Sequence, residues 1–284
     1  MSDARVRSRR LGVLVVSTVV SAGLLAALIW RVDILEFWRA VSAARLPPVA
    51  AALVLALLCN VLLSTGALAA SLRAFDSSPS YRQCLSATLG HLALHALSFV
   101  VGKGARAAYL VRTAEVPFAR AASAEALLFA EKLAALGVVV ALGAMLRVTS
   151  AFGGAALLAL IGLGYWAKRQ EARVSHVAAS LALTLALTLG QVAVFALALR
   201  ALGASVPLSE LCLFFPVCLA GAKLPIFAFG IGTREALVVT LLAGTAPAPT
   251  LLAASVIFSA VEQVFPGLFG LLFAPRFVMR TLGQ

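Results

Sequence analysis

Long stretches without a charged residue alternate along this chain with short segments that hold most of the charged ones. Residues 11–30 contain no charge over twenty positions, and residues 47–72 contain none over twenty-six. An α-helix rises 1.5 Å per residue and the hydrocarbon core of a bilayer is about 30 Å thick, so each stretch is long enough to cross it. The pattern predicts membrane-spanning helices at residues 11–30, 48–70, 119–146, 151–167, 175–200 and 249–274.

Two further apolar regions, residues 84–113 and 207–244, do not resemble simple spans. The first is interrupted by Gly102-Lys103-Gly104-Ala105-Arg106 and the second by Gly230-Ile231-Gly232-Thr233-Arg234. Non-helical backbone at membrane depth persists only where it is buried in protein or lines a wet cavity. We therefore predict that both regions are re-entrant helical hairpins, broken at these glycines.

The two interrupted regions also resemble each other at a constant offset of 128 residues (230 − 102). The offset places the predicted span 48–70 on residues 176–198. It aligns Phe99, Gly102, Gly104, Arg106 and Ala108 with Phe227, Gly230, Gly232, Arg234 and Ala236. With the hairpins entering from opposite faces, the halves 1–147 and 148–284 form an inverted repeat. Paired interrupted helices in such a repeat indicate a transporter site near the bilayer midplane.

Composition agrees with a membrane location. Of the 284 residues, 62% are hydrophobic and 12% are charged, whereas soluble domains are about half apolar and about a quarter charged. So large an apolar excess cannot be buried in one soluble core. The predicted fold class is an all-α integral membrane protein, a single polytopic domain over residues 1–284 with about six spans and two re-entrant hairpins.

The net charge of +12 does not indicate a nucleic-acid partner, because the basic residues stand at the ends of apolar segments instead of forming a groove or stripe. Cytoplasmic loops are enriched in Lys and Arg. The basic segments 71–82, 168–174 and the tail from residue 276 are therefore predicted to be cytoplasmic, together with both termini. The loop 31–46, with a net charge of only +1, is predicted to lie outside.

Two carboxylates, Glu131 and Glu262, lie near the centres of predicted spans. A charge there costs at least about 2.5–3.5 kcal/mol, so it usually faces a bundle interior or a wet cavity. We expect Arg106 to pair with Glu131, and Arg234 to pair with Glu262. Whether these groups are structural ion pairs or transport residues stays open at this stage.

The two arginines are the strongest candidates for a ligand site. A guanidinium can hold a phosphate group with two parallel hydrogen bonds, and broken helices expose backbone amides beside it. The candidate substrate-binding residues are Gly102, Lys103, Gly104, Arg106, Glu131, Lys223, Gly230, Gly232, Arg234, Glu235 and Glu262.

No catalytic residue, metal site or cofactor is predicted. His91 and His95 lie one helical turn apart, but no third ligand is evident, so a polar contact within the bundle is the preferred interpretation. The sequence contains no serine nucleophile elbow and no Walker loop. We expect the protein not to be an enzyme.

Two motifs resemble those of a known family, the lysylphosphatidylglycerol synthase transmembrane-region proteins, also called flippase-like. The first is residues 102–110 followed by Glu131-Lys132, and the more specific second is Leu224-Pro225-Ile226 with residues 230–237. The resemblance covers about residues 10–275. The chain departs from the family pattern in lacking a Pro-Gly-Gly run before Gly230, and in having Glu262 where a basic residue is common.

The resemblance implies a lipid-translocating domain of bacterial inner membranes. In bifunctional members this domain moves an aminoacylated phosphatidylglycerol that a separate soluble synthase domain makes. No such synthase domain is recognised here, so we expect no aminoacyl transfer. Stand-alone members have been linked to other lipids, including hopanoids and polyprenyl-linked lipids.

The sequence therefore favours a transporter or flippase for an anionic or lipid-linked headgroup, with a membrane phospholipid or polyprenyl-linked lipid as partner. Two alternatives stay open: a membrane-embedded transferase acting on a lipid-linked substrate, and a non-catalytic subunit of a lipid-biosynthesis complex. A second copy of the chain and a lipid-biosynthesis protein are further candidate partners.

Overall fold

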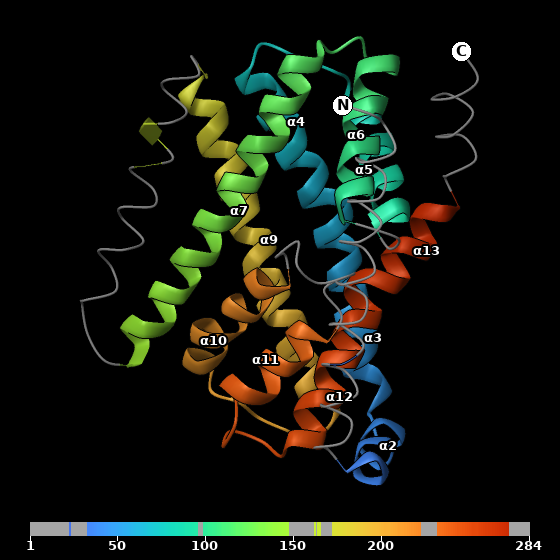
Figure 1. Cartoon of the computed structure of the whole chain (residues 1–284), viewed down its shortest axis with the longest axis vertical. Helices are drawn as coiled ribbons and strands as arrows, with labels where there is room; N and C mark the ends of the chain where they lie inside the picture. The colour runs from blue at the N-terminus through green and yellow to red at the C-terminus, as the bar shows by residue number, and fades with distance from the viewer. Residues whose placement is uncertain are drawn as a thin grey trace, which may run out of the picture.

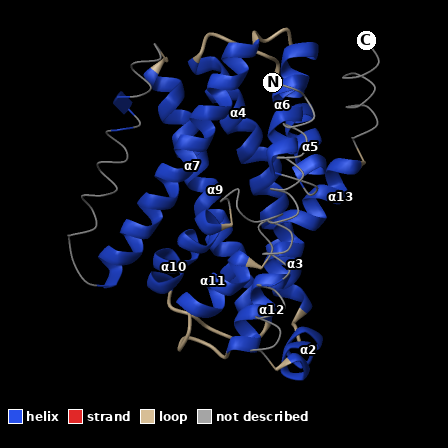
Figure 2. Ribbon diagram, viewed as in Figure 1, coloured by secondary structure: helices blue, strands red, loops and turns tan. Residues whose placement is uncertain are grey.

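The protein is described here from a computed structural model, which defines residues 23, 33–95, 99–147, 162, 164–165, 172–222 and 232–272. Within these residues the fold is built from helices joined by loops, and no β-strand is present (Figure 2). The elements are α2 (Ile34–Ser42), α3 (Leu46–Leu58), η1 (Cys59–Leu63), α4 (Ser64–Ala74), α5 (Tyr81–His95), α6 (Phe99–Thr113), α7 (Phe118–Arg147), α9 (Val174–Ala201), α10 (Leu208–Gly221), α11 (Thr233–Leu241), α12 (Ala248–Ser259), η3 (Ala260–Val264) and α13 (Phe265–Leu271).

Four of the predicted spans are confirmed as helices long and apolar enough to cross a membrane. They are the continuous helix α3–η1–α4 (Leu46–Ala74), α7 (Phe118–Arg147), α9 (Val174–Ala201) and α12–η3–α13 (Ala248–Leu271). The predicted spans 11–30 and 151–167 lie, apart from residues 23, 162, 164 and 165, outside the described residues.

Both regions predicted as hairpins consist of two short helices that pack against each other: α5 with α6, and α10 with α11. The longest of the four has 15 residues, so none exceeds about 23 Å, and none can cross a 30 Å hydrocarbon core alone. Figure 1 shows α5 and α6 in the upper half of the molecule and α10 and α11 in the lower half. The first hairpin follows the upper end of α4, and the second follows the lower end of α9.

The position of the break in the first hairpin differs from the prediction. Residues 102–106 lie inside the continuous helix α6, so their backbone amides belong to the helix and are not exposed by an interruption. The described part of α5 ends at His95, and α6 begins at Phe99. In the second hairpin, Gly232 does stand at a helix start, as the N-cap of α11 with φ of 93°. Pro216 is buried within α10.

Helix boundaries recur at the offset of 128 residues found in the sequence. The first long helix covers residues 46–74 and α9 covers 174–201, while α6 ends at Thr113 and α11 at Leu241. The order of a long helix, a short hairpin and another long helix therefore occurs twice along the chain.

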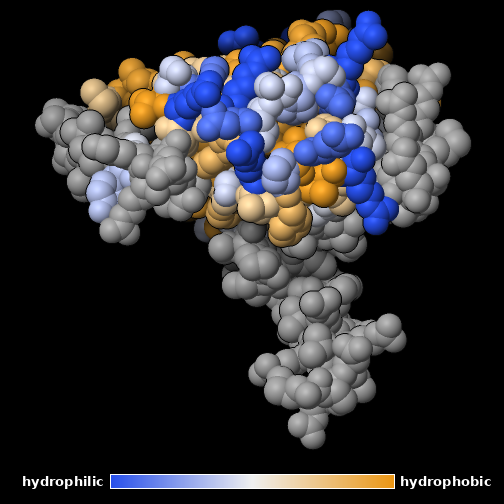
Figure 3. Space-filling view, turned by 90° about the horizontal axis from the view of Figure 1, so that it is seen from above, coloured by the Kyte–Doolittle hydropathy of each residue, from blue (hydrophilic) through white to orange (hydrophobic). Residues whose placement is uncertain are grey.

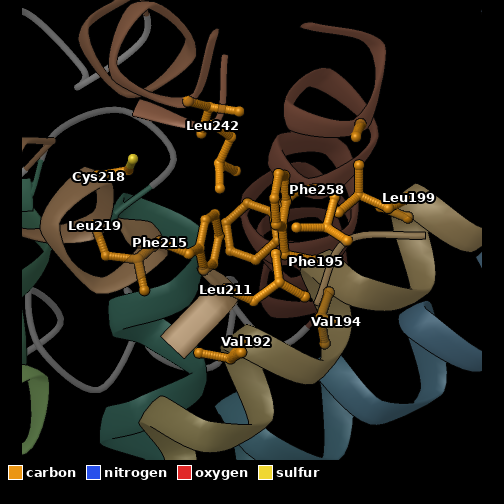
Figure 4. Close-up of a cluster of buried hydrophobic side chains, with 14 of the residues drawn as sticks. Val192, Val194, Phe195, Leu199, Leu211, Phe215, Cys218, Leu219, Leu242 and Phe258 are labelled. Atoms are coloured by element: carbon orange, nitrogen blue, oxygen red, sulfur yellow. The ribbon is translucent and has the colours of Figure 1, made fainter. Parts of the chain in front are cut away.

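The main hydrophobic core lies in the lower half, where α9, α10 and α12 meet. Phe195 stacks on Phe215 with ring centroids 4.1 Å apart, and Phe258 meets both rings edge-on (Figure 4). Gly143 of α7 lies directly against the backbone of α10, where a Cβ atom would approach the amide nitrogen of Leu213 to 2.4 Å. These contacts hold the second hairpin against three of the long helices.

The segment 31–46, predicted as a loop, contains the helix α2. Asp33 begins it, since its carboxylate accepts hydrogen bonds from the backbone N–H groups of Leu35 and Glu36. None of its residues is buried, and Ile34, Leu35 and Trp38 are exposed. Exposed apolar residues on a short helix at the end of a membrane span are typical of a helix that lies in the lipid interface.

Candidate functional site

Polar side chains occur at the centres of all four long helices. Asn60 lies at the midpoint of Leu46–Ala74, Lys132 at that of Phe118–Arg147 and Thr188 at that of Val174–Ala201. Glu262 lies within one turn of the centre of Ala248–Leu271. Four helices that cross the same bilayer share a midplane, so these groups lie at similar depth, where polar side chains are costly unless they contact one another.

These central residues form one hydrogen-bonded cluster, the midplane network, made of Asn60, Lys132, Thr188, Gln191 and Glu262. The ammonium of Lys132 donates to Gln191 Oε1 (2.7 Å) and Thr188 Oγ1 (3.1 Å). The amide of Gln191 donates in turn to Glu262 Oε2 (3.2 Å), which also accepts from Asn60 Nδ2 (2.9 Å). Gln191 therefore bridges a cation and a carboxylate that come from different helices.

Two of these residues lie in π-helical turns. Asn60 belongs to η1 and Glu262 to η3. Single π-turns inside α-helices are rare and occur often at functional sites. Here the two π-turns bring the amide of Asn60 and the carboxylate of Glu262 together, so the irregular backbone and the polar cluster coincide.

Glu131, the neighbour of Lys132, points to a different part of α9. It is fully buried, and its Oε2 accepts a hydrogen bond of 2.6 Å from the hydroxyl of Ser180. Its Oε1 finds no hydrogen-bond partner among the described residues. Two adjacent residues of α7 thus hold opposite charges at mid-membrane depth in separate surroundings.

In the first hairpin, Arg106 forms a two-point ion pair with Glu125 of α7. Its Nε and Nη2 atoms lie 2.5 and 2.6 Å from the two carboxylate oxygens, and the arginine is only 5% exposed. One turn away, the ammonium of Lys103 lies 5.0 Å from the centre of the Phe129 ring, within the range of a cation–π contact. Both cations therefore meet α7.

In the second hairpin, Arg234 pairs with its own neighbour, Glu235, at 2.7 Å. Both side chains are 2% exposed. Glu235 also accepts from the backbone N–H of Gly232 (2.6 Å) and from Ser259 Oγ (3.0 Å), and Arg234 donates to the same serine. The guanidinium lies 5.0 Å from the centre of the Phe258 ring.

The two ion pairs predicted from the sequence are wrong. Arg106 pairs with Glu125 and not with Glu131, and Arg234 pairs with Glu235 and not with Glu262. The sequence showed that these charges lie within apolar segments but could not show which helix face each one occupies. Of the other predicted site residues, Gly102 is buried and Gly104 exposed within α6, while Lys223 and Gly230 lie outside the described residues.

The ion pairs and the midplane network lie one after another between the two hairpins, and together they are called the polar track. It begins at the Arg106–Glu125 pair, follows α7 for about two turns to Glu131 and Lys132, and crosses through Gln191 to Glu262. Ser259, one turn before Glu262 on the same helix, joins it to the Arg234–Glu235 pair. The track thus crosses α7, α9 and α12–η3 within the membrane-spanning part.

Several residues of this track were missed by the sequence reasoning: Asn60, Glu125, Ser180, Thr188, Gln191 and Ser259. A lone amide near the centre of an apolar span was a usable signal for Asn60 and Gln191. Glu125 lies inside a predicted span, and its six-residue distance from Glu131 gave no indication of its role.

Among the described residues no group of three His, Cys, Asp or Glu side chains is placed to hold a metal ion. His91 is half-buried on α5, and the side chain of His95 lies outside the described residues.

Long apolar helices, two short helical hairpins and buried charges define a polytopic α-helical membrane protein. The family model of the lysylphosphatidylglycerol synthase TM region matches residues 14–270. This chain therefore belongs to that family, which confirms the resemblance drawn from the two motifs and places it among membrane proteins related to lipid modification or transport. No curated protein matches the sequence of this chain.

Proposed function

We propose that this protein moves an anionic lipid, or a lipid-linked headgroup, across the bacterial inner membrane. The observation that carries the proposal is the polar track, which lies between the two hairpins and passes through the middle of the long helices. An ordinary helix bundle has no need of eight ionisable side chains in this region, because each charge lowers the stability of the inserted state unless it is partnered.

The charges of the track, together with the neighbouring Lys103, balance in number. Four cations, Lys103, Arg106, Lys132 and Arg234, stand against four carboxylates, Glu125, Glu131, Glu235 and Glu262. A headgroup that carries a phosphate can exchange places with a carboxylate at an arginine, since both anions accept the same two parallel hydrogen bonds. In this mechanism the carboxylates keep each arginine neutralised until the lipid arrives.

The arrangement of the elements supports the same function. The order of long helix, hairpin and long helix repeats at an offset of 128 residues, and the hairpins enter from opposite ends (Figure 1). Inverted repeats with interrupted helices are the usual framework of secondary transporters, with the substrate site where the repeats meet. The midplane network lies on that boundary, because α7 belongs to the first half and α9 and η3 to the second.

Surface charge supports an orientation with the upper end, whose hydrophilic residues are seen from above in Figure 3, in the cytoplasm. The described charged residues exposed there are five arginines and two acids, a net of +3, against four arginines and two acids at the lower end, a net of +2. The upper residues are Arg73, Arg82, Arg112, Arg120, Arg173, Asp76 and Glu115; the lower ones are Arg39, Arg45, Arg147, Arg200, Asp33 and Glu36. This agrees with the cytoplasmic termini predicted from the sequence.

The experiment is a translocation assay on purified protein in vesicles that contain labelled phosphatidylglycerol in the inner leaflet or in both. Wild-type protein is expected to expose label to an external quencher faster than protein-free vesicles do. Glu262→Gln, Lys132→Met and Arg234→Ala should each slow this movement at least tenfold. Glu36→Gln, the same carboxylate-to-amide change on exposed α2, should leave it unchanged.

The alternatives predict different results, the transferase in the same vesicle preparation and the accessory subunit in cells. A transferase would convert a lipid-linked substrate into product, and an accessory subunit would tolerate Glu262→Gln and Lys132→Met without effect on growth or lipid composition. Absence of movement above protein-free vesicles for phosphatidylglycerol and for polyprenyl-phosphate lipids alike would refute the transport proposal.

A further inference from the structure

A pocket of about 260 Å³ opens at the upper end of the molecule, away from the polar track. It is lined by Arg73, Asp76, Ser77, Ser78, Arg173 and His176. These residues come from the C-terminal end of the span Leu46–Ala74, the loop after it and the first turn of the span Val174–Ala201. Because both spans end here, the pocket lies at the level where a bilayer has its headgroups.

Backbone hydrogen bonds at the end of α4 and the start of α9 hold the walls of the pocket in place. Helix α4 ends in a Schellman motif, in which the backbone N–H of Ser77 donates to Leu72 O (3.0 Å) and that of Asp76 donates to Arg73 O (3.2 Å). Asp76 takes the left-handed position of this motif, with φ of 55°. The backbone N–H of Arg173 donates to Ala74 O (3.0 Å), which fixes the start of α9 against the end of α4. The last carbonyls of α4 are thus occupied and do not repel an anion.

The electrostatics of the pocket favour an anion. Helix α9 is 28 residues long, and its N-cap Arg173, which makes no side-chain cap hydrogen bond, lines the pocket, so the positive end of the helix dipole lies beside it. Arg73 and Arg173 add two guanidinium groups, and His176 adds an imidazole. The opposing charge is Asp76, whose Oδ1 lies 2.6 Å from Arg173 Nη2. Both partners are more than half exposed, so this pair is screened by water and adds little stability.

Ser77 gives an independent indication of a ligand. The residue is 6% exposed, it lines the pocket, and its hydroxyl finds no hydrogen-bond partner among the described residues. A buried hydroxyl without a partner is costly, and such groups are rare in folded proteins. A ligand oxygen in the pocket would supply the missing hydrogen bond.

We propose that this pocket binds a phosphate group, as a phosphomonoester or a phosphodiester. Its oxygens accept from Arg73, Arg173 and the Ser77 hydroxyl, while Asp76 turns toward water. The same chemistry is offered by a lipid headgroup in the adjacent leaflet and by a soluble phosphate compound. The site is distinct from the polar track, and the pocket variants separate the two proposals, because Arg73→Gln and Ser77→Ala change binding in the pocket without altering any residue of the track.

The experiment compares three probes on the full chain purified in phosphate-free maltoside micelles. Calorimetric titration measures binding of inorganic phosphate and of glycerol 3-phosphate, and native mass spectrometry measures retention of phosphatidylglycerol against diacylglycerol of equal chain length. Preferential retention of phosphatidylglycerol, with weak binding of the soluble probes, identifies a lipid headgroup as ligand. Saturable binding of the soluble probes, with no preference for phosphatidylglycerol, identifies a soluble phosphate compound.

Variants test the assignment of the pocket. Arg73→Gln should weaken binding of the preferred probe about tenfold and Ser77→Ala about threefold, since bonds to a charged ligand are the stronger ones. Asp76→Asn should strengthen it about threefold, because it removes the competing carboxylate. Arg82→Gln, which removes an exposed arginine at the same end but outside the pocket, is the matched control and should change binding less than twofold. The proposal is overturned if no probe binds saturably, or if Arg82→Gln weakens binding as much as Arg73→Gln does.

Discussion

The two hairpins carry the same motif, with glycines two positions apart followed by an arginine, yet they hold that arginine in different ways. In the first, Arg106 lies in the middle of α6 and is neutralised by Glu125 from another helix. In the second, Arg234 lies in the first turn of α11 and is neutralised by the next residue, Glu235. One pair therefore binds its hairpin to α7, and the other is completed within the hairpin itself.

The difference shows that the motif does not determine the role of its glycines. Gly102 and Gly104 are helical, whereas Gly232 is the N-cap of α11 in a conformation that side chains rarely adopt. The difference between the two ion pairs also indicates which hairpin can move without breaking its pair. Breaking the Arg106–Glu125 pair separates α6 from α7, whereas the Arg234–Glu235 pair can remain intact if α11 moves as a unit, provided that the contacts to Ser259 and Phe258 are exchanged.

The largest expected effect is that of Glu235→Ala. It leaves the guanidinium of Arg234, which is 2% exposed, without its carboxylate, and it removes the hydrogen bond to the backbone N–H of Gly232. Removing one partner of a buried pair costs about 3–5 kcal/mol. Equilibrium unfolding in mixed micelles titrated with dodecyl sulfate would measure it. Glu36→Ala on exposed α2 is the control, and equal losses in the two variants would contradict the buried pair.

Glu125→Gln tests the corresponding pair of the first hairpin. It keeps the shape of the side chain but removes its charge, so about 2 kcal/mol should be lost, in the range of hydrogen bonds to charged groups. The double variant Arg106→Met with Glu125→Leu should recover most of this loss, because no charge then remains buried. The same unfolding assay gives the coupling energy. Losses that simply add across the two sites would show that the pair does not connect α6 to α7.

Gly232→Ala should destabilise the protein by about 1–2 kcal/mol, because a Cβ atom is strained at φ of 93°. Gly232→Asn, which tolerates the left-handed region better, should lose less. Thermal unfolding in detergent would rank the variants. If alanine and asparagine are both harmless, α11 begins at another residue.

Gly104→Ala should have the smallest effect, and the opposite sign. Gly104 is exposed within α6, and an added Cβ atom would meet nothing within 4 Å. Alanine in a helix interior is favoured over glycine by about 0.5–1 kcal/mol, so the variant should unfold at a higher temperature. A lower unfolding temperature would restore the break at residues 102–106 that the sequence first suggested.

Much of the fold could be predicted from hydrophobic pattern alone. The spans 48–70, 119–146, 175–200 and 249–274 reappear as helices whose ends differ from the predicted ones by at most four residues. A span must match the thickness of the bilayer, and charged residues mark its ends, so length and charge are sufficient signals. Helix α2 was missed because a short interfacial helix has no such length requirement.

The sequence predicted which residues belong to the candidate site better than it predicted which residues they contact. Arg106, Glu131, Arg234 and Glu262 are all buried, in agreement with their depth in the sequence. Their partners were wrong, because two residues at the same depth can face opposite sides of their helices. Nor did the sequence indicate the π-turns that bring Asn60 to Glu262.

By itself, the sequence determined that this is a membrane protein, which segments form long apolar helices and where charged residues fall within them. It could do so because each segment must match the thickness and polarity of the bilayer independently of the others. Only the tertiary structure decided which charges meet, since helix rotation and packing depend on every neighbour at once. The midplane network of Lys132, Gln191 and Glu262 arises from three helices that are far apart along the chain, and no local pattern specifies that encounter.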